Sequence, residues 1–473
     1  MVVLGQRGKI SKIIGERTGA NLSYIAEDHR IDFFGRPKAV EAAAELVERA
    51  VQHYQYSGLQ FARKENLNLL CPELTDAPGV QLLRSSRPIN TVSGGVEGFV
   101  LAPLDEETAA ETGLFSDRSQ QPGASTSGQQ GNAPAPPRLL RPAADAEACL
   151  QRVLDLAVTI SLQHPAQCER TELRLYLGKL ALVDVATSAR LLPPGQLLEW
   201  AYPKGGRAVF ETALPQATVV SLDKYLTSRG MVATQQAKSA SLHLETSIPW
   251  VQYHPTFSVD AASGQLRLAK LETLGCKPLT VALVGPPDRT DVRLRYVASV
   301  EHSEDDPVAS ELRRREGEFT LSPNGVQINI PDDLHTMDLT LTSARVKLKR
   351  VYVSSDPLQP PPSAWPLPPA ASAASAPAAP AAGTTRRRRR SAAAPAAAPL
   401  PPVRLKVSVA AVLDNFGARR LEVTVACPEV NAALMELHRT REEGEGARAR
   451  LEALVRSLLA HVQHLRENVA FEP

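Results

Sequence analysis

The chain has 473 residues, of which 43% are hydrophobic and only 5% are aromatic, and its formal net charge is +2. This length accommodates two or three domains with a sizeable core. The near-neutral charge excludes a protein that binds nucleic acid through bulk positive charge alone. The sequence contains no run of 18 apolar residues and no secretory signal, so we expect neither a membrane span nor a membrane partner.

Cysteine usage is typical of an intracellular protein. The five cysteines are odd in number and far apart, and no two of them form a Cys-x-x-Cys pair. This pattern favours reduced thiols in the cytoplasm or nucleus over disulfides or a zinc site. We therefore expect no bound metal and no cofactor. The cysteines are Cys71, Cys149, Cys168, Cys276 and Cys427.

Residues 1–54 predict a first compact unit. The hydrophobic pair Val3-Leu4 leads into the loop Gly5-Gln6-Arg7-Gly8, and the aliphatic residues that follow recur at helical spacing. Thr18-Gly19-Ala20 predicts the end of this helix, with the glycine at positive φ. Alternating apolar residues then predict a two-stranded hairpin, and a second amphipathic helix completes the unit.

The order of these elements resembles the KH domain (K homology, type I), a small module that binds single-stranded nucleic acid. The resemblance covers about residues 2–54. It implies a groove for about four unstacked nucleotides between the Gly-x-x-Gly loop and a strand. Loop N–H groups and basic side chains would contact phosphates there, and apolar side chains would lie under the bases. The residues that the resemblance assigns to nucleic-acid binding are Val3, Leu4, Gly5, Gln6, Arg7, Gly8, Lys9, Ile10, Lys12, Ile14, Arg17, Leu22 and Tyr24.

The KH pattern is incomplete at its start. Families of this topology begin with a strand and most of a helix, whereas only four residues precede Gly5 here. We expect that the sequence is a fragment or a mis-started gene product. The alternatives are that another segment supplies the missing strand, or that the module is degenerate. An organelle stays open as a location, because a missing start would also hide a targeting peptide.

The chain after this unit divides by composition. Residues 55–115 form an unassigned extension, and residues 116–146, rich in Ser, Gln, Gly and Pro, predict a disordered linker. Residues 147–353 predict a central α+β domain on an antiparallel sheet, because a helical pattern is followed by alternating strand patterns. The strands expected in this domain are residues 173–182 (two strands around Gly178), 241–246, 265–271, 279–284, 292–300, 317–321, 326–330 and 345–353.

Residues 354–402 form a Pro/Ala-rich insertion that cannot bury a core, so we expect it to be disordered. We interpret its run of Arg386, Arg387, Arg388, Arg389 and Arg390 as a flexible arm that binds phosphate backbone. A nuclear import signal and low-complexity drift are the alternatives. Residues 403–473 predict two strands, at about 404–413 and 420–426, and two helices that pack on the central domain.

The sequence shows no catalytic motif, and we assign no catalytic residue. A phosphate-binding loop, a dinucleotide fingerprint and a nucleophile elbow are all missing. His461 and His464 lie three apart on the last predicted helix, but without a third ligand we interpret them as solvated histidines. We interpret Glu304-Asp305-Asp306 as a turn and helix cap. The segment around Leu177-Gly178 resembles the uncharacterised region that follows KH domains in some fungal proteins, which implies no activity.

The sequence therefore predicts an α+β protein, with an incomplete KH module, a mixed antiparallel-sheet domain and long disordered Pro/Ala-rich segments. The leading hypothesis is a non-enzymatic RNA-binding protein. Its partner would be single-stranded RNA, with DNA less favoured, and its central domain would contact a protein partner. The alternatives are a structural adaptor with a degenerate KH fold and, third, an RNA-processing enzyme with its chemistry in residues 147–353.

Overall fold

The computed structural model describes most of the chain. Residues 1–8, 112–139 and 362–399 lie outside the described residues, and they carry the Gly-x-x-Gly loop, most of the predicted linker and the arginine run. The described ranges are 9–58, 67–111, 140–142, 151–158, 170–183, 191–192, 207–361, 400–469 and 471. Gaps within these ranges fall at residues 26, 28–29, 72–73, 75–76, 86–87, 92–93, 152–153, 156, 235, 247–250, 261, 275–278, 323–324, 326, 332–333, 335–337, 415–418 and 441–444.

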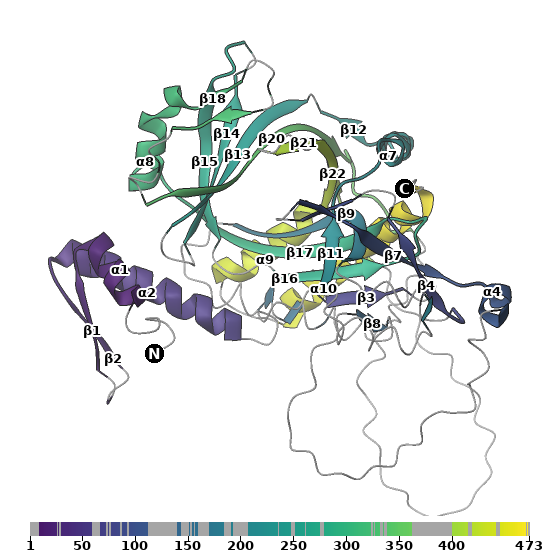
Figure 1. The fold of residues 1–473 in the computed structure, drawn as a ribbon, viewed down its shortest axis with the longest axis horizontal. Coiled ribbons are helices and arrows are strands. Elements are labelled where there is room, and N and C mark those ends of the chain that lie inside the picture. The colour runs from purple at the N-terminus through teal and green to yellow at the C-terminus, as the bar shows by residue number, and fades with distance from the viewer. Residues whose placement is uncertain are drawn as a thin grey trace, which may run out of the picture.

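The N-terminal unit is a helix, a hairpin and a helix, in the order that the sequence predicts (Figure 1). Helix α1 (Lys9–Thr18) ends at Gly19, which has φ +75° and donates its N–H to the Gly15 carbonyl at 2.8 Å. Only a residue that tolerates positive φ closes a helix in this way without strain. Antiparallel strands and a long helix follow, namely β1 (Asn21–Ile25), β2 (Arg30–Phe34) and α2 (Pro37–Gly58).

The central feature is a closed barrel of eight antiparallel strands, seen as a ring in Figure 1. Each strand pairs with its neighbour around the ring, and the last pairs with the first, since β17 bonds to β9 as well as to β15. In order around the ring the strands are β9 (Arg170–Val183), β22 (Arg419–Ala426), β21 (Lys406–Asp414), β20 (Thr340–Val353), β13 (Ala237–Glu245), β14 (Gln252–Val259), β15 (Leu266–Leu274) and β17 (Asp291–Glu301).

This barrel corrects the predicted fold class. The α+β prediction was wrong, because the protein is mostly β and its central strands form one closed barrel. Periodicity assigns single strands but not their partners. Closure depends on pairings between distant segments, such as Val423 opposite Leu177 and Leu177 opposite Val292.

Apolar side chains cover the outer face of the barrel. Along β9, Leu173, Leu175 and Leu177 are buried and belong to one cluster with residues of α7 (Gln216–Ser228), α9 (Pro428–Thr440) and α10 (Glu445–Asn468). The apolar stripe predicted on the last helix is confirmed as part of this core. Its buried members are Leu451, Leu454, Val455, Leu458, Leu459, Val462 and Leu465. Among the described helices, none is long and apolar enough to cross a membrane.

Shorter elements extend the sheet beyond the barrel or cap it. Strand β16 pairs with β17 and also, in parallel, with β3, while β11 and β7 both pair with the far end of β9. These and the remaining elements are β3 (Leu67–Leu70), β4 (Val80–Arg84), β5 (Ile89–Thr91), β6 (Gly94–Val96), β7 (Gly98–Pro103), α4 (Glu106–Glu111), β8 (Leu140–Pro142), β10 (Leu191–Leu192), β11 (Arg207–Glu211), β12 (Val232–Ala233), β16 (Leu279–Val284), α8 (Pro307–Arg314), a 3-10 turn (Glu316–Glu318), β18 (Thr320–Leu321) and β19 (Ile328–Asn329).

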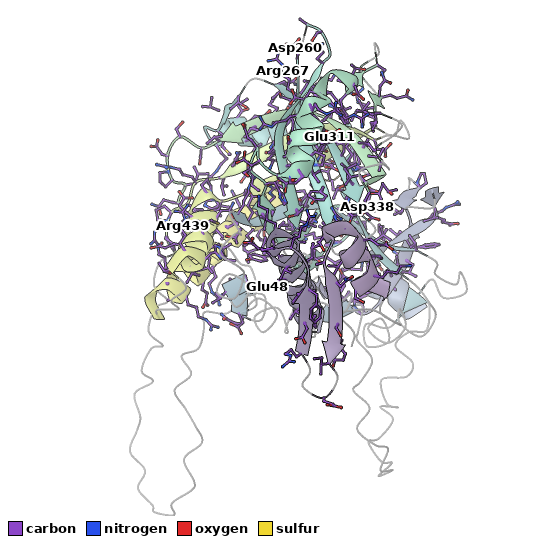
Figure 2. The ribbon with its side chains drawn as sticks, turned by 90° about the vertical axis from the view of Figure 1, so that its left-hand side faces the viewer. Glu48, Asp260, Arg267, Glu311, Asp338 and Arg439 are labelled. Atoms are coloured by element: carbon purple, nitrogen blue, oxygen red, sulfur yellow. The ribbon has the colours of Figure 1, made fainter. Side chains whose placement is uncertain are left out.

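The N-terminal unit lies against the barrel. Ile14 of α1 and Ala43 of α2 have no exposed surface and share one apolar cluster with barrel residues such as Leu242. Arg17 of α1 forms an ion pair of 3.3 Å with Asp338, which precedes β20 and has φ +57°. Figure 2 shows Asp338 where the N-terminal helices meet the barrel.

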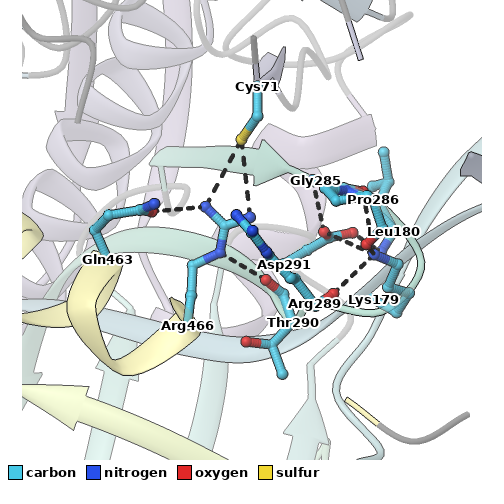
Figure 3. A network of polar contacts seen from close by, with 10 residues as sticks. All are labelled: Cys71, Lys179, Leu180, Gly285, Pro286, Arg289, Thr290, Asp291, Gln463 and Arg466. Carbon is cyan, nitrogen blue, oxygen red and sulfur yellow. Dashed lines mark hydrogen bonds and ion pairs between the residues drawn. The ribbon is translucent and has the colours of Figure 1, made fainter. Parts of the chain in front are cut away.

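A buried polar network ties the start of β17 to β9 (Figure 3). The Lys179 ammonium donates to Asp291 at 3.1 Å and to the carbonyls of Gly285, Pro286 and Arg289 at 3.2, 2.6 and 2.9 Å. The Asp291 carboxylate also accepts from the backbone N–H groups of Leu180 and Gly285, at 2.7 and 2.8 Å. Every strong donor and acceptor of this charge pair is therefore satisfied.

The same turn is held by the last helix. Arg466 of α10 is buried, and its Nε donates to the Thr290 carbonyl at 2.6 Å. Its guanidinium also approaches the Cys71 sulfur at 3.7 and 3.8 Å and donates to Gln463 at 3.0 Å (Figure 3). Residues far apart in the sequence thus meet at one turn, beside the barrel.

Candidate functional site in the barrel lumen

Alternation along the barrel strands directs charged side chains inward. On β9, Arg170, Glu172, Arg174 and Tyr176 alternate with the buried leucines of the outer core. Because successive side chains of a strand point to opposite faces, these four residues face the lumen. The lumen is therefore polar, although the barrel is wrapped in an apolar shell.

The lumen contains a cavity of about 390 Å³. This volume is in the range of small-molecule sites and exceeds what a single water or ion needs. Its walls come from β9, β13, β14, β15, β17 and β20. The lining residues are Arg170, Glu172, Arg174, Tyr176, Ser241, Leu242, His243, His254, Glu272, Leu274, Arg295, Val297, Ser299, Ser343 and Arg345.

Cations outnumber carboxylates on the inward face. Strand alternation and register place further charged residues on the same face as those that line the cavity. The cations that line the cavity are Arg170, Arg174, Arg295 and Arg345, and Lys270, Arg293, Lys347, Lys349, Lys406 and Arg420 lie on the same face of the strands. The carboxylates that line the cavity are Glu172 and Glu272, and Glu245, Glu301, Asp414 and Glu422 lie on the same face.

Both carboxylates that line the cavity are held by basic side chains. Glu172 pairs with Arg170 and with Arg174 on its own strand. Glu272 accepts from Lys270 at 2.7 Å. Although burial alone would raise the pKa of Glu272, Lys270 and the neighbouring arginines hold it below its ordinary value. The carboxylate therefore stays ionised and partly neutralises the cations around it.

The second group of carboxylates lies near the other end of the lumen. Glu422 accepts from Arg420 at 2.7 Å and lies 3.7 Å from Lys347, while Asp414 lies 3.7 Å from Arg420. Burial would raise the pKa of Glu422, but Lys347 and Arg420 lower it. In the lining of the cavity two carboxylates accompany four arginines, so positive charge is in excess.

The excess positive charge lowers the pKa of further basic residues in the lumen. Burial and then the charges of Lys406, Arg174 and Lys347 lower the pKa of Lys349 to about 8. Burial, and then Arg420, likewise depress the pKa of Arg345. A base whose neighbours are mostly bases is poorly stabilised in its charged form. The bases of the lumen therefore repel one another, and an anion would relieve this repulsion.

Arg293, another base on the inward face, lies close to two aromatic rings. Its guanidinium carbon is 5.4 Å from the Tyr176 ring centroid and 4.7 Å from that of Phe210. Burial and the charge of Arg295 lower the pKa of Arg293, and its buried Nε has no hydrogen-bond partner among the described residues. Stacking on two rings holds the charge in place without neutralising it.

Gly178 allows β11 to pack closely on β9. A Cβ at position 178 would lie 2.2 Å from the Glu211 carbonyl oxygen and 2.6 Å from the Phe210 ring. Only glycine therefore allows β11 to pack directly on β9 at this point. The Leu177-Gly178 pair that stood out in the sequence is a close backbone approach beside the lumen.

The predicted nucleic-acid residues of the N-terminal unit lie far from this lumen in the sequence and on another surface. Lys12 is exposed and lies 3.8 Å from Glu16, while Arg17 is engaged by Asp338. Ile14, predicted to lie under the bases, is fully buried, and Leu22 and Tyr24 are half-buried. Lys9 and Ile10 belong to α1, but their side chains are outside the described part.

The other predicted binding residues lie outside the described residues, so their role stays a prediction. These residues are Val3, Leu4, Gly5, Gln6, Arg7, Gly8, Arg386, Arg387, Arg388, Arg389 and Arg390. The predicted protein partner of the central domain also stays a prediction.

Two smaller predictions outside the lumen have opposite outcomes. Asp306 is confirmed as a helix cap, since its carboxylate accepts from the N–H groups of Val308 and Ala309 at 2.8 and 3.2 Å. The prediction that His461 is solvated was wrong, because it is buried with its Nε2 3.2 Å from the Leu358 carbonyl. Within the described residues, no three His, Cys, Asp or Glu side chains are grouped as a metal site.

No protein-family model matches the chain, and no curated protein matches it. Among solved structures, the chain is similar to the Pct1 RNA triphosphatase of S. pombe, which was solved in complex with the Spt5 CTD. The sequence identity is 15% and the TM-score is 0.37, over 68% of this chain and 94% of the other. This similarity is too low to assign a family or a fold, so the lumen itself carries the functional argument.

Proposed function

We propose that the protein binds a phosphate-rich anion in the lumen of its barrel. The observation that carries this proposal is the surplus of four arginines over two carboxylates in the lining of a cavity of about 390 Å³. A single negative charge would leave part of this surplus in place. A polyphosphate brings several charges within a few ångströms, and Arg and Lys are the residues that hold phosphate best.

The role that the geometry favours is binding. Both carboxylates that line the cavity, Glu172 and Glu272, form ion pairs with Arg or Lys, so neither is poised as a general base. His254 is neutral near pH 7, because burial and the nearby His243 lower its pKa to about 4. The prediction of a non-enzymatic protein therefore remains our proposal, now with the lumen as its site.

The test is calorimetric titration of the full chain with inorganic triphosphate. We expect 1:1 binding that weakens strongly between low and high salt, because screening acts on charge attraction. Affinity is also expected to fall as the pH rises through about 8, where Lys349 loses its proton in the free protein. Failure to bind triphosphate at low salt and pH 7 would refute the proposal.

Matched pairs of variants separate the lumen from the rest of the surface. Arg345→Gln and Lys349→Met each remove one lumen charge, and each is expected to weaken triphosphate binding about 10- to 100-fold. Arg267→Gln and Lys238→Met remove the same charges from exposed positions, Arg267 at the end of the barrel far from the N-terminal unit (Figure 2). Equal losses in both pairs would show nonspecific attraction instead of a lumen site.

A second candidate function is the predicted single-stranded RNA groove of the N-terminal unit. The observation in its favour is the helix, hairpin and helix in the expected order, with Lys12 exposed on α1. Changing both Gln6 and Arg7 to Asp is expected to abolish binding of a labelled random single-stranded RNA, measured by fluorescence anisotropy, because the new acids repel phosphates. The same variant is expected to bind triphosphate normally, which separates the two candidates.

A further inference from the structure

The lumen has two walls of different chemistry. Of its six Arg and Glu lining residues, β9 contributes Arg170, Glu172 and Arg174 and the neighbouring β17 contributes Arg295, while Glu272 comes from β15 and Arg345 from β20. The lining residues of β13 and β14 include no Arg, Lys, Asp or Glu, and they are Ser241, Leu242, His243 and His254. We refer to the lining residues of β9 and β17 as the cationic wall, and to those of β13 and β14 as the histidine wall.

The two walls face each other across the lumen. In the ring of eight strands, β13 lies four strands away from β9 in either direction, and β14 lies three strands from β9 and two from β17. Residues of β13 and β14 are therefore across the cavity from those of β9. An occupant that fills the cavity contacts both walls at once, and the two walls select for different chemistry at its two sides.

His254 is the unsatisfied group of the histidine wall. Its Nε2 is buried but has no hydrogen-bond partner among the residues that the structure describes. A buried polar atom without a partner destabilises the folded chain, so such atoms are rare outside functional sites. Because His254 also lines the cavity, a bound molecule is in a position to supply the missing partner.

The ring of His254 is held in place by its neighbours. The His243 ring packs on it with centroids 4.2 Å apart, and His243 Nε2 lies 3.4 Å from Oε1 of Gln252. Gln252 in turn donates from Nε2 to Glu245 at 3.2 Å. The His254 ring is thus packed against a hydrogen-bonded neighbour, while its own Nε2 has no partner among the described residues.

An uncharged imidazole opposite an arginine-rich wall selects for an asymmetric ligand. Phosphates gain more from Arg174 and Arg295 than from a neutral ring, so they are drawn to the cationic wall. A hydroxyl both donates and accepts, so it satisfies the free nitrogen in either tautomer of His254. The group that the histidine wall suits is therefore a hydroxyl-bearing organic moiety.

We infer that the ligand of the lumen is an organic polyphosphate, with its phosphates on the cationic wall and a sugar hydroxyl at Nε2 of His254. This inference rests on the proposed function and adds the class of ligand and its orientation. It assigns His254 as the residue that distinguishes a phosphorylated sugar compound from inorganic polyphosphate.

The experiment compares a nucleoside triphosphate with inorganic triphosphate on the full chain by calorimetry. The wild type is expected to bind the nucleoside triphosphate at least tenfold more tightly, because only this ligand reaches both walls. His254→Phe is expected to weaken the nucleoside triphosphate about 10- to 100-fold and to change inorganic triphosphate less than about twofold. His254→Gln, whose side-chain amide keeps a hydrogen-bonding group there, is expected to recover most of the loss.

His464→Phe is the matched control, since His464 lies on α10 against Tyr225, away from the lumen. Thermal unfolding of each variant shows that loss of binding is not loss of fold. Equal affinity of the wild type for both ligands, or equal weakening of both ligands by His254→Phe, would overturn the inference while leaving the proposed function intact. Binding of neither ligand to the wild type would instead remove the proposed function itself.

Discussion

The protein buries positive charge in two regions and treats it in opposite ways. Beside the barrel, Lys179 has four oxygen partners, of which one is the carboxylate of Asp291. Inside the barrel, Lys349 is surrounded mainly by other bases, which together with burial lower its pKa to about 8. The two lysines lie on strands of the same barrel but have different electrostatic surroundings.

The difference separates charge that holds the fold from charge that awaits a ligand. A buried cation with all its donors used is part of the structure, and removing its partner leaves a desolvated charge. A cation among cations destabilises the free protein and becomes favourable only when an anion arrives. Three predictions follow from this contrast and test it in order of decreasing effect.

The largest effect on stability is expected at the buried ion pair of Lys179 and Asp291. Asp291→Asn removes the charge opposite Lys179, so we expect unfolding free energy to fall by about 3–5 kcal/mol. Urea denaturation at pH 7 measures this directly. The double variant Lys179→Met with Asp291→Asn is expected to recover part of the loss, because the stranded charge is gone. A loss below about 1 kcal/mol for Asp291→Asn would break the comparison.

At Lys349 in the lumen, loss of the positive charge is expected to raise the stability of the folded protein. The ordinary pKa of lysine, about 10.5, applies to Lys349 in the unfolded chain, and its pKa in the folded protein is about 8. Between these values the unfolded chain holds one proton more, so Lys349 contributes a rise in stability as the pH increases from about 8 to about 10.5. Below pH 8 the full cost of its charge is present.

Lys349→Met therefore should stabilise the free protein at pH 7 by about 1 kcal/mol, after allowance for solvent screening. The variant should also lack part of the rise in stability that the wild type shows above pH 8. Urea midpoints at pH 7 and pH 9.5 measure both effects. A variant less stable than the wild type at pH 7 would show that Lys349 holds the fold as Lys179 does.

The smallest effects are expected at two histidines that repeat the contrast. Burial lowers the pKa of both His461 and His254 to about 4, so each is neutral in the folded protein at pH 7. Below pH 6.5 the unfolded chain takes up protons that the folded chain does not, so stability falls as the pH decreases from 6.5 to about 4. Replacing either residue by Phe should reduce this slope, measured by urea midpoints at pH 7 and pH 5.

At pH 7 the two Phe variants are expected to differ in their effect on the free energy of unfolding. His461 has a partner in the Leu358 carbonyl, so His461→Phe is expected to destabilise the protein by about 1 kcal/mol. His254 Nε2 has none among the described residues, so His254→Phe is expected to be neutral or stabilising. Destabilisation by both variants would indicate that His254 has a structural role.

Most barrel strands could be located from the sequence, but their closure could not. Alternating apolar residues predicted strands that overlap β13, β15, β17, β20, β21 and β22. Strand β14 was missed because Pro255 lies at its centre, where proline usually argues against a strand. The segment around Gly178 was predicted as two strands and is one, β9. Which strands pair is set by contacts between segments hundreds of residues apart, and periodicity contains no such information.

The polar lumen was also missed, because its position depends on closure of the ring. The polar half of Arg170-Thr171-Glu172-Leu173-Arg174 resembles the solvent face of an ordinary sheet, where charged residues need no explanation. Only ring closure turns that face inward. A signal was present, since Arg345, Lys347 and Lys349 repeat the same two-residue spacing of bases on β20. The prediction of site residues instead followed the Gly-x-x-Gly loop, which lies outside the described residues.

The position of β22 in the ring affects how the protein is made. This strand fills the place between β9 and β21, with Val423 opposite both Leu177 and Val409. A ribosome must therefore translate through Ala426 before the ring can close. Until then, the basic side chains of β9 and β20 are exposed to water, and β9 and β21 have unpaired edges that can join other chains. Because contacts of such sequence separation form slowly, we expect the nascent chain to be prone to aggregation until β22 has been made and has paired with both neighbours.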